Sequence, residues 1–169
     1  MRLTSHTDFA LRILMSLAVM EERLVTIEEL AKRHKLSRNH LMKVAQTLVG
    51  LGYVTGVRGR VGGLKLAKPA STIRMGKVVR DLEGDTRLVE CLGDGPFTCI
   101  LNGACLLTRS MDRAADAFFA ELDQVTLAGL VAPRRTLRQR LGIGEESEPV
   151  AAALTPISTD ETKGLLPCQ

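Results

Sequence analysis

Three cysteines in the middle of this chain are the residues with the clearest potential for chemistry. Cys91, Cys99 and Cys105 fall within fifteen residues, with seven residues between the first pair and five between the second. The glycines among them let the segment fold several thiolates around one centre. Thiolates are soft ligands, and such a group in a chain without a secretory signal favours an iron–sulfur cluster or zinc over a disulfide framework.

Two other interpretations of these cysteines stay open. A structural Zn²⁺ prefers four protein ligands and often uses CxxC pairs, which this sequence lacks. A bare thiol sensor needs no metal at all. We expect no enzyme, because a thiol oxidoreductase also uses CxxC and no nucleophile–base pair stands out. Cys168 is the second-last residue and is interpreted as a bystander.

The charges are divided unevenly along the chain. Residues 1–80 hold 15 Lys and Arg against 5 Asp and Glu, whereas residues 81–169 hold 8 against 14. A basic half beside an acidic remainder is typical of a nucleic-acid-binding domain joined to a part with another role. Aromatic residues make up only 3%, which favours an aliphatic helical core. No apolar run near the amino end is long enough to cross a bilayer, so we expect a cytoplasmic protein without membrane contact.

Three predicted helices carry the basic residues. Apolar spacing predicts a helix over 5–20 that Thr4 or Ser5 can cap, a second over 27–33 opened by a Thr26–Glu29 capping box, and a third from Ser37, its cap, to Gly50. Two short helices around a tight turn predict a helix-turn-helix. Polar residues at the amino end of the third helix can reach bases or phosphates in the major groove. They are Ser37, Arg38, Asn39, His40 and Lys43.

A two-stranded wing is predicted directly after these helices. Strands over 53–57 and 64–66 enclose a basic, glycine-rich turn in which Arg58 and Arg60 flank a glycine. Arginines at such a tip suit the narrow, negative minor groove of DNA. Helix-turn-helix and wing together predict a DNA-binding domain over residues 1–83.

The rest of the chain is assigned to the cysteine loop and to assembly. A helix over 73–82 precedes the loop, residues 84–106, and a long helix over 108–122 follows it. The apolar stripe of the long helix must be buried, in the chain's own core or against a second copy. We expect residues 107–132 to form the dimerisation helix and one following helix, order to end at Pro133, and residues 142–169 to be a disordered tail. The expected fold is mainly α with a small β-wing.

These motifs resemble the NsrR-type repressors, which sense nitric oxide and share a superfamily of winged-helix regulators with IscR. The resemblance rests on segments 8–12, 36–44 and 52–63 and on the three-cysteine loop. It implies a homodimer with one iron–sulfur cluster per subunit, held by Cys91, Cys99 and Cys105. It also implies that the cluster-loaded protein represses nitrosative-stress genes by binding a double-stranded DNA operator, and that nitric oxide inactivates it.

The resemblance further suggests a fourth ligand. In the IscR branch a histidine three residues after the last cysteine completes the site, and here that position is Thr108. In NsrR-type proteins an aspartate of the other subunit has this role, and it corresponds to Asp8. His6 or solvent is the alternative ligand, and the spacing does not choose between [2Fe-2S] and [4Fe-4S]. The alternative function is a regulator that senses iron–sulfur or redox status.

Overall fold

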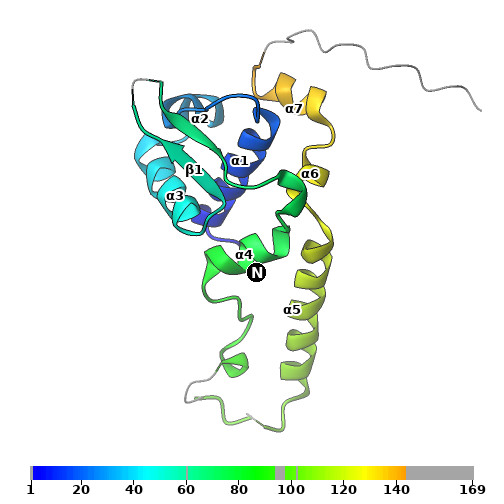
Figure 1. Ribbon diagram of the computed structural model, residues 1–169. Helices are drawn as coiled ribbons and strands as arrows, with labels where there is room; N and C mark the ends of the chain where they lie inside the picture. Colours follow the sequence, from blue (N-terminus) through cyan, green and yellow to red (C-terminus); the bar gives the residue numbers. More distant parts are fainter. Residues whose placement is uncertain (1, 60, 94–97, 102, 144–169) are drawn as a thin grey trace, which may run out of the picture.

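The computed structural model describes residues 2–59, 61–93, 98–101 and 103–143. Those ranges form a helical head with one small sheet, and a long helix that runs away from the head (Figure 1). None of the described helices is both long and apolar enough to cross a membrane. In chain order the elements are α1 (Ser5–Val19), α2 (Ile27–His34), α3 (Arg38–Gly50), β1 (Val54–Val57), β2 (Gly63–Leu66), η1 (Ala70–Thr72), α4 (Met75–Glu83), η2 (Glu90–Leu92), α5 (Leu106–Gln124), α6 (Leu127–Leu130) and α7 (Arg134–Arg140).

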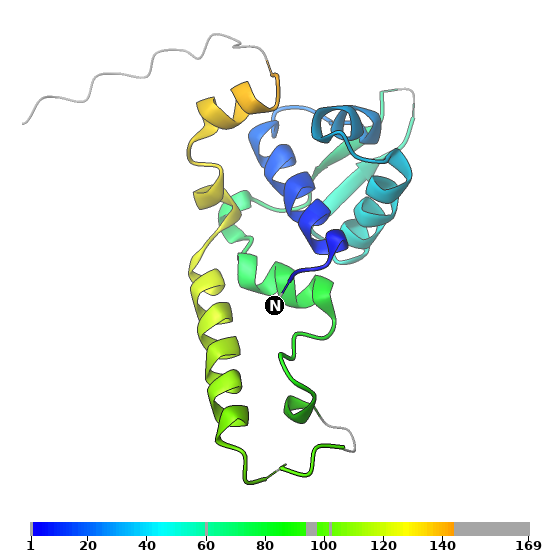
Figure 2. The same cartoon turned by 180° about the vertical axis from the view of Figure 1, so that it is seen from behind.

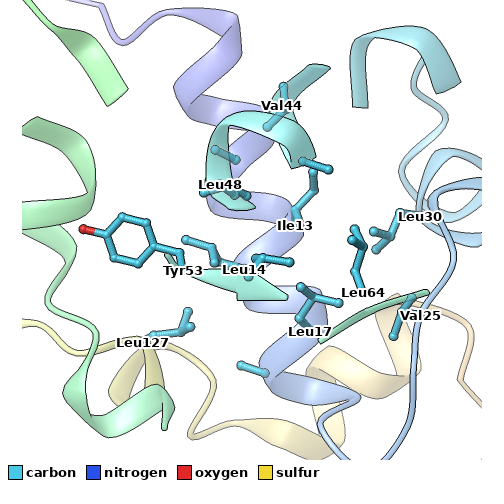
Figure 3. Close-up of a cluster of buried hydrophobic side chains, with 14 of the residues drawn as sticks. Ile13, Leu14, Leu17, Val25, Leu30, Val44, Leu48, Tyr53, Leu64 and Leu127 are labelled. Carbon is cyan, nitrogen blue, oxygen red and sulfur yellow. The ribbon is translucent and has the colours of Figure 1, made fainter. Parts of the chain in front are cut away.

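Helix α1 is the centre of the head. Thr4 caps it, since the Thr7 N–H donates to the Thr4 hydroxyl oxygen at 3.2 Å. Figure 3 shows Ile13, Leu14 and Leu17 of α1 among side chains from the surrounding elements, all of the labelled ones aliphatic except Tyr53. Burying each side chain of this size contributes roughly 2 kcal/mol to folding. The labelled neighbours are Val25, Leu30, Val44, Leu48, Tyr53, Leu64 and Leu127.

The helix-turn-helix forms where it is predicted. Of the two hydrogen bonds predicted for the capping box of α2, one forms and the other does not. The Glu29 N–H donates to the Thr26 hydroxyl at 3.1 Å, as expected. The Glu29 carboxylate does not reach back to Thr26. It accepts hydrogen bonds from Arg23 and Arg33 instead, and these lower the pKa of Glu29 to about 2. Two guanidinium partners outcompete one backbone N–H because charge-assisted hydrogen bonds are the stronger kind.

The wing is an antiparallel pair whose register runs from Val54↔Leu66 to Val57↔Gly63. Its glycines are required locally: Gly59 has φ +123°, and a Cβ at Gly62 would collide with the Val57 carbonyl oxygen. A third, unpredicted strand-like contact joins the wing to the segment before α2, where Val25 and Leu64 exchange backbone hydrogen bonds of 3.0 and 2.8 Å. Arg60 lies outside the described residues.

Helices α4 and α5 connect the head to the cysteine segment. Arg80 of α4 donates two hydrogen bonds to the Asp123 carboxylate of α5, at 2.8 and 2.7 Å, and its guanidinium lies 4.4 Å from the Phe119 ring centroid. Figures 1 and 2 show α5 extending away from the head, with the chain between α4 and α5 beside it.

The expectation that order ends at Pro133 is wrong. Helix α7 follows that residue, and its Leu137 and the next residue at the same face, Leu141, pack against the head's core. Arg134 also pairs with Glu21 at 3.2 Å. Leu137 and Leu141 are four residues apart, so they lie on one face of the helix, which packs on the head. Two apolar residues are too few to predict a helix from the sequence. Most of the predicted tail, from Gly144 on and including Cys168, lies outside the described residues.

Candidate cysteine site and DNA-binding surface

The cysteine segment lies at the end of α5 that is far from the head (Figures 1 and 2). Cys91 lies in η2, and Cys105 occupies the N-cap position of α5. Both side chains are half-buried. These two cysteines thus lie on the two elements that border the loop, η2 and α5. The two elements are in contact in the folded chain.

The two bordering cysteines meet at one threonine. The Cys91 Sγ lies 3.2 Å from the Thr108 Oγ1. Cys105 is contacted by the backbone N–H of Thr108, then by that of Leu107 and by the Thr108 hydroxyl, and these hydrogen bonds lower the pKa of the Cys105 thiol. Orphan amides at a helix amino end stabilise negative charge, so this end of α5 favours thiolates.

The third cysteine does not join them in the described structure. Cys99 is exposed on the loop, and the described residues contain no group of three or more His, Cys, Asp or Glu side chains placed to hold a metal ion. The donor chemistry nevertheless fits an iron–sulfur cluster: two thiols converge on a polar helix end, and a third lies on the loop that connects them.

Asp8 is not part of this group. It lies in the first turn of α1, where its carboxylate accepts hydrogen bonds from the Arg12 guanidinium at 3.2 and 2.7 Å. Because α1 lies in the head and the cysteine loop lies at the far end of α5, Asp8 and His6 are remote from the cysteines of their own chain (Figure 1). A ligand role for Asp8 therefore requires a second subunit, and it stays a prediction.

The predicted DNA-reading residues share one exposed surface at the amino end of α3. Asn39, His40 and Lys43 are exposed, and Arg38 is exposed while pairing with Glu28 at 3.0 Å. Ser37 is the N-cap residue, but among the described residues its side chain makes no capping hydrogen bond, contrary to the prediction. The Ser37 residue is also exposed. On the wing, Arg58 is exposed, and Arg60 lies outside the described residues.

The chain has close relatives among bacterial regulators. Residues 3–133 match the Rrf2 family, an iron-dependent transcriptional regulator. The HTH-type transcriptional regulator NsrR of Bacillus licheniformis is 40% identical over 142 residues, which cover 83% of this chain and 99% of that relative. The chain belongs to the Rrf2 family.

Solved structures agree with this assignment. The oxidized form of Staphylococcus aureus CymR has a TM-score of 0.65 at 26% identity, covering 78% of this chain and 97% of that one. T. potens IscR has a TM-score of 0.64, covering 82% and 91%; at 22% identity it shows the fold alone. The winged-helix prediction is confirmed. The relatives are transcriptional regulators, so this Rrf2 protein is a regulator and not an enzyme.

Sequence reasoning missed two contacts of this Rrf2 chain. Thr108 was noted only as a departure from histidine, although a residue in the first turn of a helix points back toward the N-cap, here Cys105. The buried Tyr53, the one tyrosine of the chain, donates to Asp81 of α4 at 2.6 Å and so ties the wing to α4. A lone buried phenol needs a partner, but the sequence does not say which carboxylate provides it.

Proposed function

We propose that this Rrf2 regulator is a cytoplasmic, homodimeric repressor whose binding to a double-stranded DNA operator depends on an iron–sulfur cluster that senses nitric oxide. One cluster per subunit, [2Fe-2S] or [4Fe-4S], is held by Cys91, Cys99 and Cys105 and by the partner subunit's Asp8. The observation that carries the proposal is the meeting of Cys91 and Cys105 at the amino end of α5. The 40% identity to an NsrR protein favours nitric oxide as the signal.

The surface of α5 supports the homodimer. Of its side chains, all of them described, Phe119 alone is buried, although the helix carries a continuous apolar stripe. Leu106 and Leu107 are 75% and 57% exposed. The described part of the chain thus leaves Leu107 exposed and Met111 and Phe118 only half-buried, which supports a second copy as the cover. A symmetric partner helix is the simplest cover, since regulators with a single reading head usually bind DNA as twofold dimers.

The exposed polar surface of α3 supports operator binding. Arg and Lys suit guanine or phosphate and Asn suits adenine, and all of these types occur within two turns of α3. A dimer must present two such surfaces one or more DNA turns apart, about 34 Å each. A ligand that connects α1 of one subunit to the cysteine loop of the other fixes that spacing, so its loss changes operator affinity.

A bound cluster would supply iron that can react with nitric oxide. A carboxylate is a weak ligand for a soft iron site, so the partner subunit's Asp8 would be an exchangeable ligand. Asp8→Ala tests this arrangement. We expect the variant to keep the three-cysteine cluster but to change its response to nitric oxide, measured as release of operator DNA. Arg12→Ala is the matched control, because it removes the same α1 ion pair and keeps the carboxylate. Equal responses of both variants and of the wild type contradict the role of Asp8.

The alternative is a thiol sensor without metal or with zinc. It is favoured by the exposure of Cys99 and by the likeness to CymR, whose oxidized form has been solved. Anaerobic purification followed by absorption spectroscopy, iron and sulfide analysis separates the two functions. We expect a brown protein that binds duplexes selected from a randomised pool and releases them on exposure to nitric oxide. A colourless, iron-free protein with equal affinity for the same duplexes contradicts the proposal.

A further inference from the structure

We propose that Thr108 is a positioning residue for the cluster, whose hydroxyl donates a hydrogen bond to cysteine sulfur and sets how firmly the cluster is held and how readily it is reduced. The inference rests on the proposed function, because it requires that a cluster be bound. In the IscR branch the position of Thr108 is expected to hold a histidine ligand. We assign Thr108 a different role, as a hydrogen-bond donor to cysteine sulfur.

The geometry centres on one side chain that reaches two cysteines far apart in the sequence. Thr108 lies in the first turn of α5, three residues after Cys105. Its Oγ1 lies 3.2 Å from the Cys91 Sγ, and its N–H and hydroxyl both contact Cys105. Thr108 is itself half-buried, on the part of α5 that contacts η2, so water competes only partly for these contacts.

The Thr108 hydroxyl has a single proton and can donate it to only one of the two cysteine sulfurs at a time. A metal-bound thiolate can only accept hydrogen bonds, so the Thr108 hydroxyl must be the donor, and it has one proton to give. Cys105 already receives the backbone N–H groups of Leu107 and Thr108. Cys91 has the hydroxyl as its described hydrogen-bond partner. We therefore expect the Thr108 hydroxyl to donate its proton to the Cys91 sulfur. Cys91 lies on η2, a 3-10 helix of three residues.

Hydrogen bonds to cluster sulfurs have a known physical effect. They stabilise the more negative, reduced state more than the oxidised state, so they raise the reduction potential, and they also orient the ligand. A role of Thr108 in packing alone would change the melting temperature without changing the potential. The two roles can therefore be separated by measurement.

The test compares three variants of the full-length, anaerobically purified protein. Thr108→Val removes the hydroxyl and keeps the shape and the backbone N–H, and Thr108→Ser keeps the hydroxyl. Ser110→Ala is the matched control, because Ser110 is exposed on the same helix and its hydroxyl contacts the Leu106 carbonyl oxygen rather than a cysteine. The measurements are the rate of iron release to a chelator, the reduction midpoint, the visible circular dichroism of the cluster and the melting temperature.

We expect Thr108→Val to release iron about 10-fold faster and to have a more negative midpoint, the size expected when a partner of a metal ligand is lost. Thr108→Ser and Ser110→Ala should match the wild type. Equal midpoints and release rates in Thr108→Val and the wild type overturn the inference and leave the proposed function intact. Equal defects in the Val and Ser variants also overturn it, since the hydroxyl is then not the cause. A wild type without iron or sulfide refutes the proposed function itself, and the inference with it.

Discussion

The head and the cysteine segment are built in opposite ways. The head packs fully buried aliphatic side chains from helices, wing and α6 around α1, and its few polar interior groups are hydrogen-bonded, as with the Ser16 hydroxyl and the His34 Nε2 at 2.7 Å. None of the described residues from Gly84 to Leu107 is buried. That segment is attached by a few polar contacts, among them Cys91 to Thr108. Among the described residues, the head therefore has a buried core of its own and the cysteine segment has none.

The difference assigns separate sources of stability to the two regions. Apolar burial stabilises the head, whereas under the proposed function the cysteine segment would be stabilised by metal–ligand bonds and subunit contact. If the segment is the proposed sensor, a signal could act on it without unfolding the head.

The largest effect that separates the two regions is expected for Cys99→Ala. Removing this exposed thiolate should abolish the visible chromophore, because two thiolates hold an iron–sulfur cluster poorly. The head should be unaffected, so the far-ultraviolet circular dichroism should keep its helical signal. A variant that stays brown, with iron and sulfide still present, would remove Cys99 from the ligand set.

One alanine substitution in each region should change the free energy of unfolding by very different amounts. Leu48 of the head is fully buried, and Leu48→Ala should lower the free energy of unfolding by about 2–5 kcal/mol. Ile100 of the cysteine segment is 96% exposed, and Ile100→Ala in the cluster-free protein should change it by about 0.5 kcal/mol or less. Denaturant titration measures both, and similar losses would show that the segment is packed in solution.

Substitutions in the exposed polar surface of α3 should change the specificity of DNA binding rather than the stability of the fold. Arg38→Ala or Asn39→Ala should reduce discrimination between operator and unrelated DNA by about 1–3 kcal/mol if a bidentate base contact is lost. The unfolding midpoint should stay near that of the wild type, because both side chains are exposed. Binding titrations at fixed salt give the value, and a uniform loss on both DNAs would indicate a phosphate contact instead.

A smaller, pH-dependent effect is expected at Glu29 in the head. Its pKa is lowered from the ordinary 4.5 to about 2 by Arg23 and Arg33, so its contribution to stability is present above pH 4.5 and is lost as the pH falls toward 2. Since this cluster of charges is near the surface, we expect about 1 kcal/mol. Glu29→Gln should flatten the pH dependence of unfolding in that window, and an unchanged slope would contradict the assignment.

Helical periodicity was enough to predict the head. The apolar residues of α1 and α3 repeat at one spacing, and glycines and caps mark their ends, so local signals agreed with the final packing. Helix α7 was missed because only two apolar residues, Leu137 and Leu141, carry its signal within an arginine-rich stretch. The partner of the Glu29 carboxylate was missed because it depends on where Arg23 lies after folding.

The candidate site was predictable in kind but not in arrangement. Cysteine spacing indicated a soft-metal site, and no local rule could place Cys91 beside Thr108, since this contact forms only when η2 packs on α5. The roles of Asp8 and of the reading-surface residues concern a second subunit and DNA, and they stay predictions.

The backbone bridge between Val25 and Leu64 restricts how a signal can reach the DNA. It joins the start of the helix-turn-helix to the wing, so neither can swing independently without breaking two main-chain hydrogen bonds. Under the proposed function, loss of the cluster would then rotate or translate each winged helix as one rigid body. Operator release would then come from a changed spacing between the two subunits' DNA-binding surfaces, each of which would stay intact.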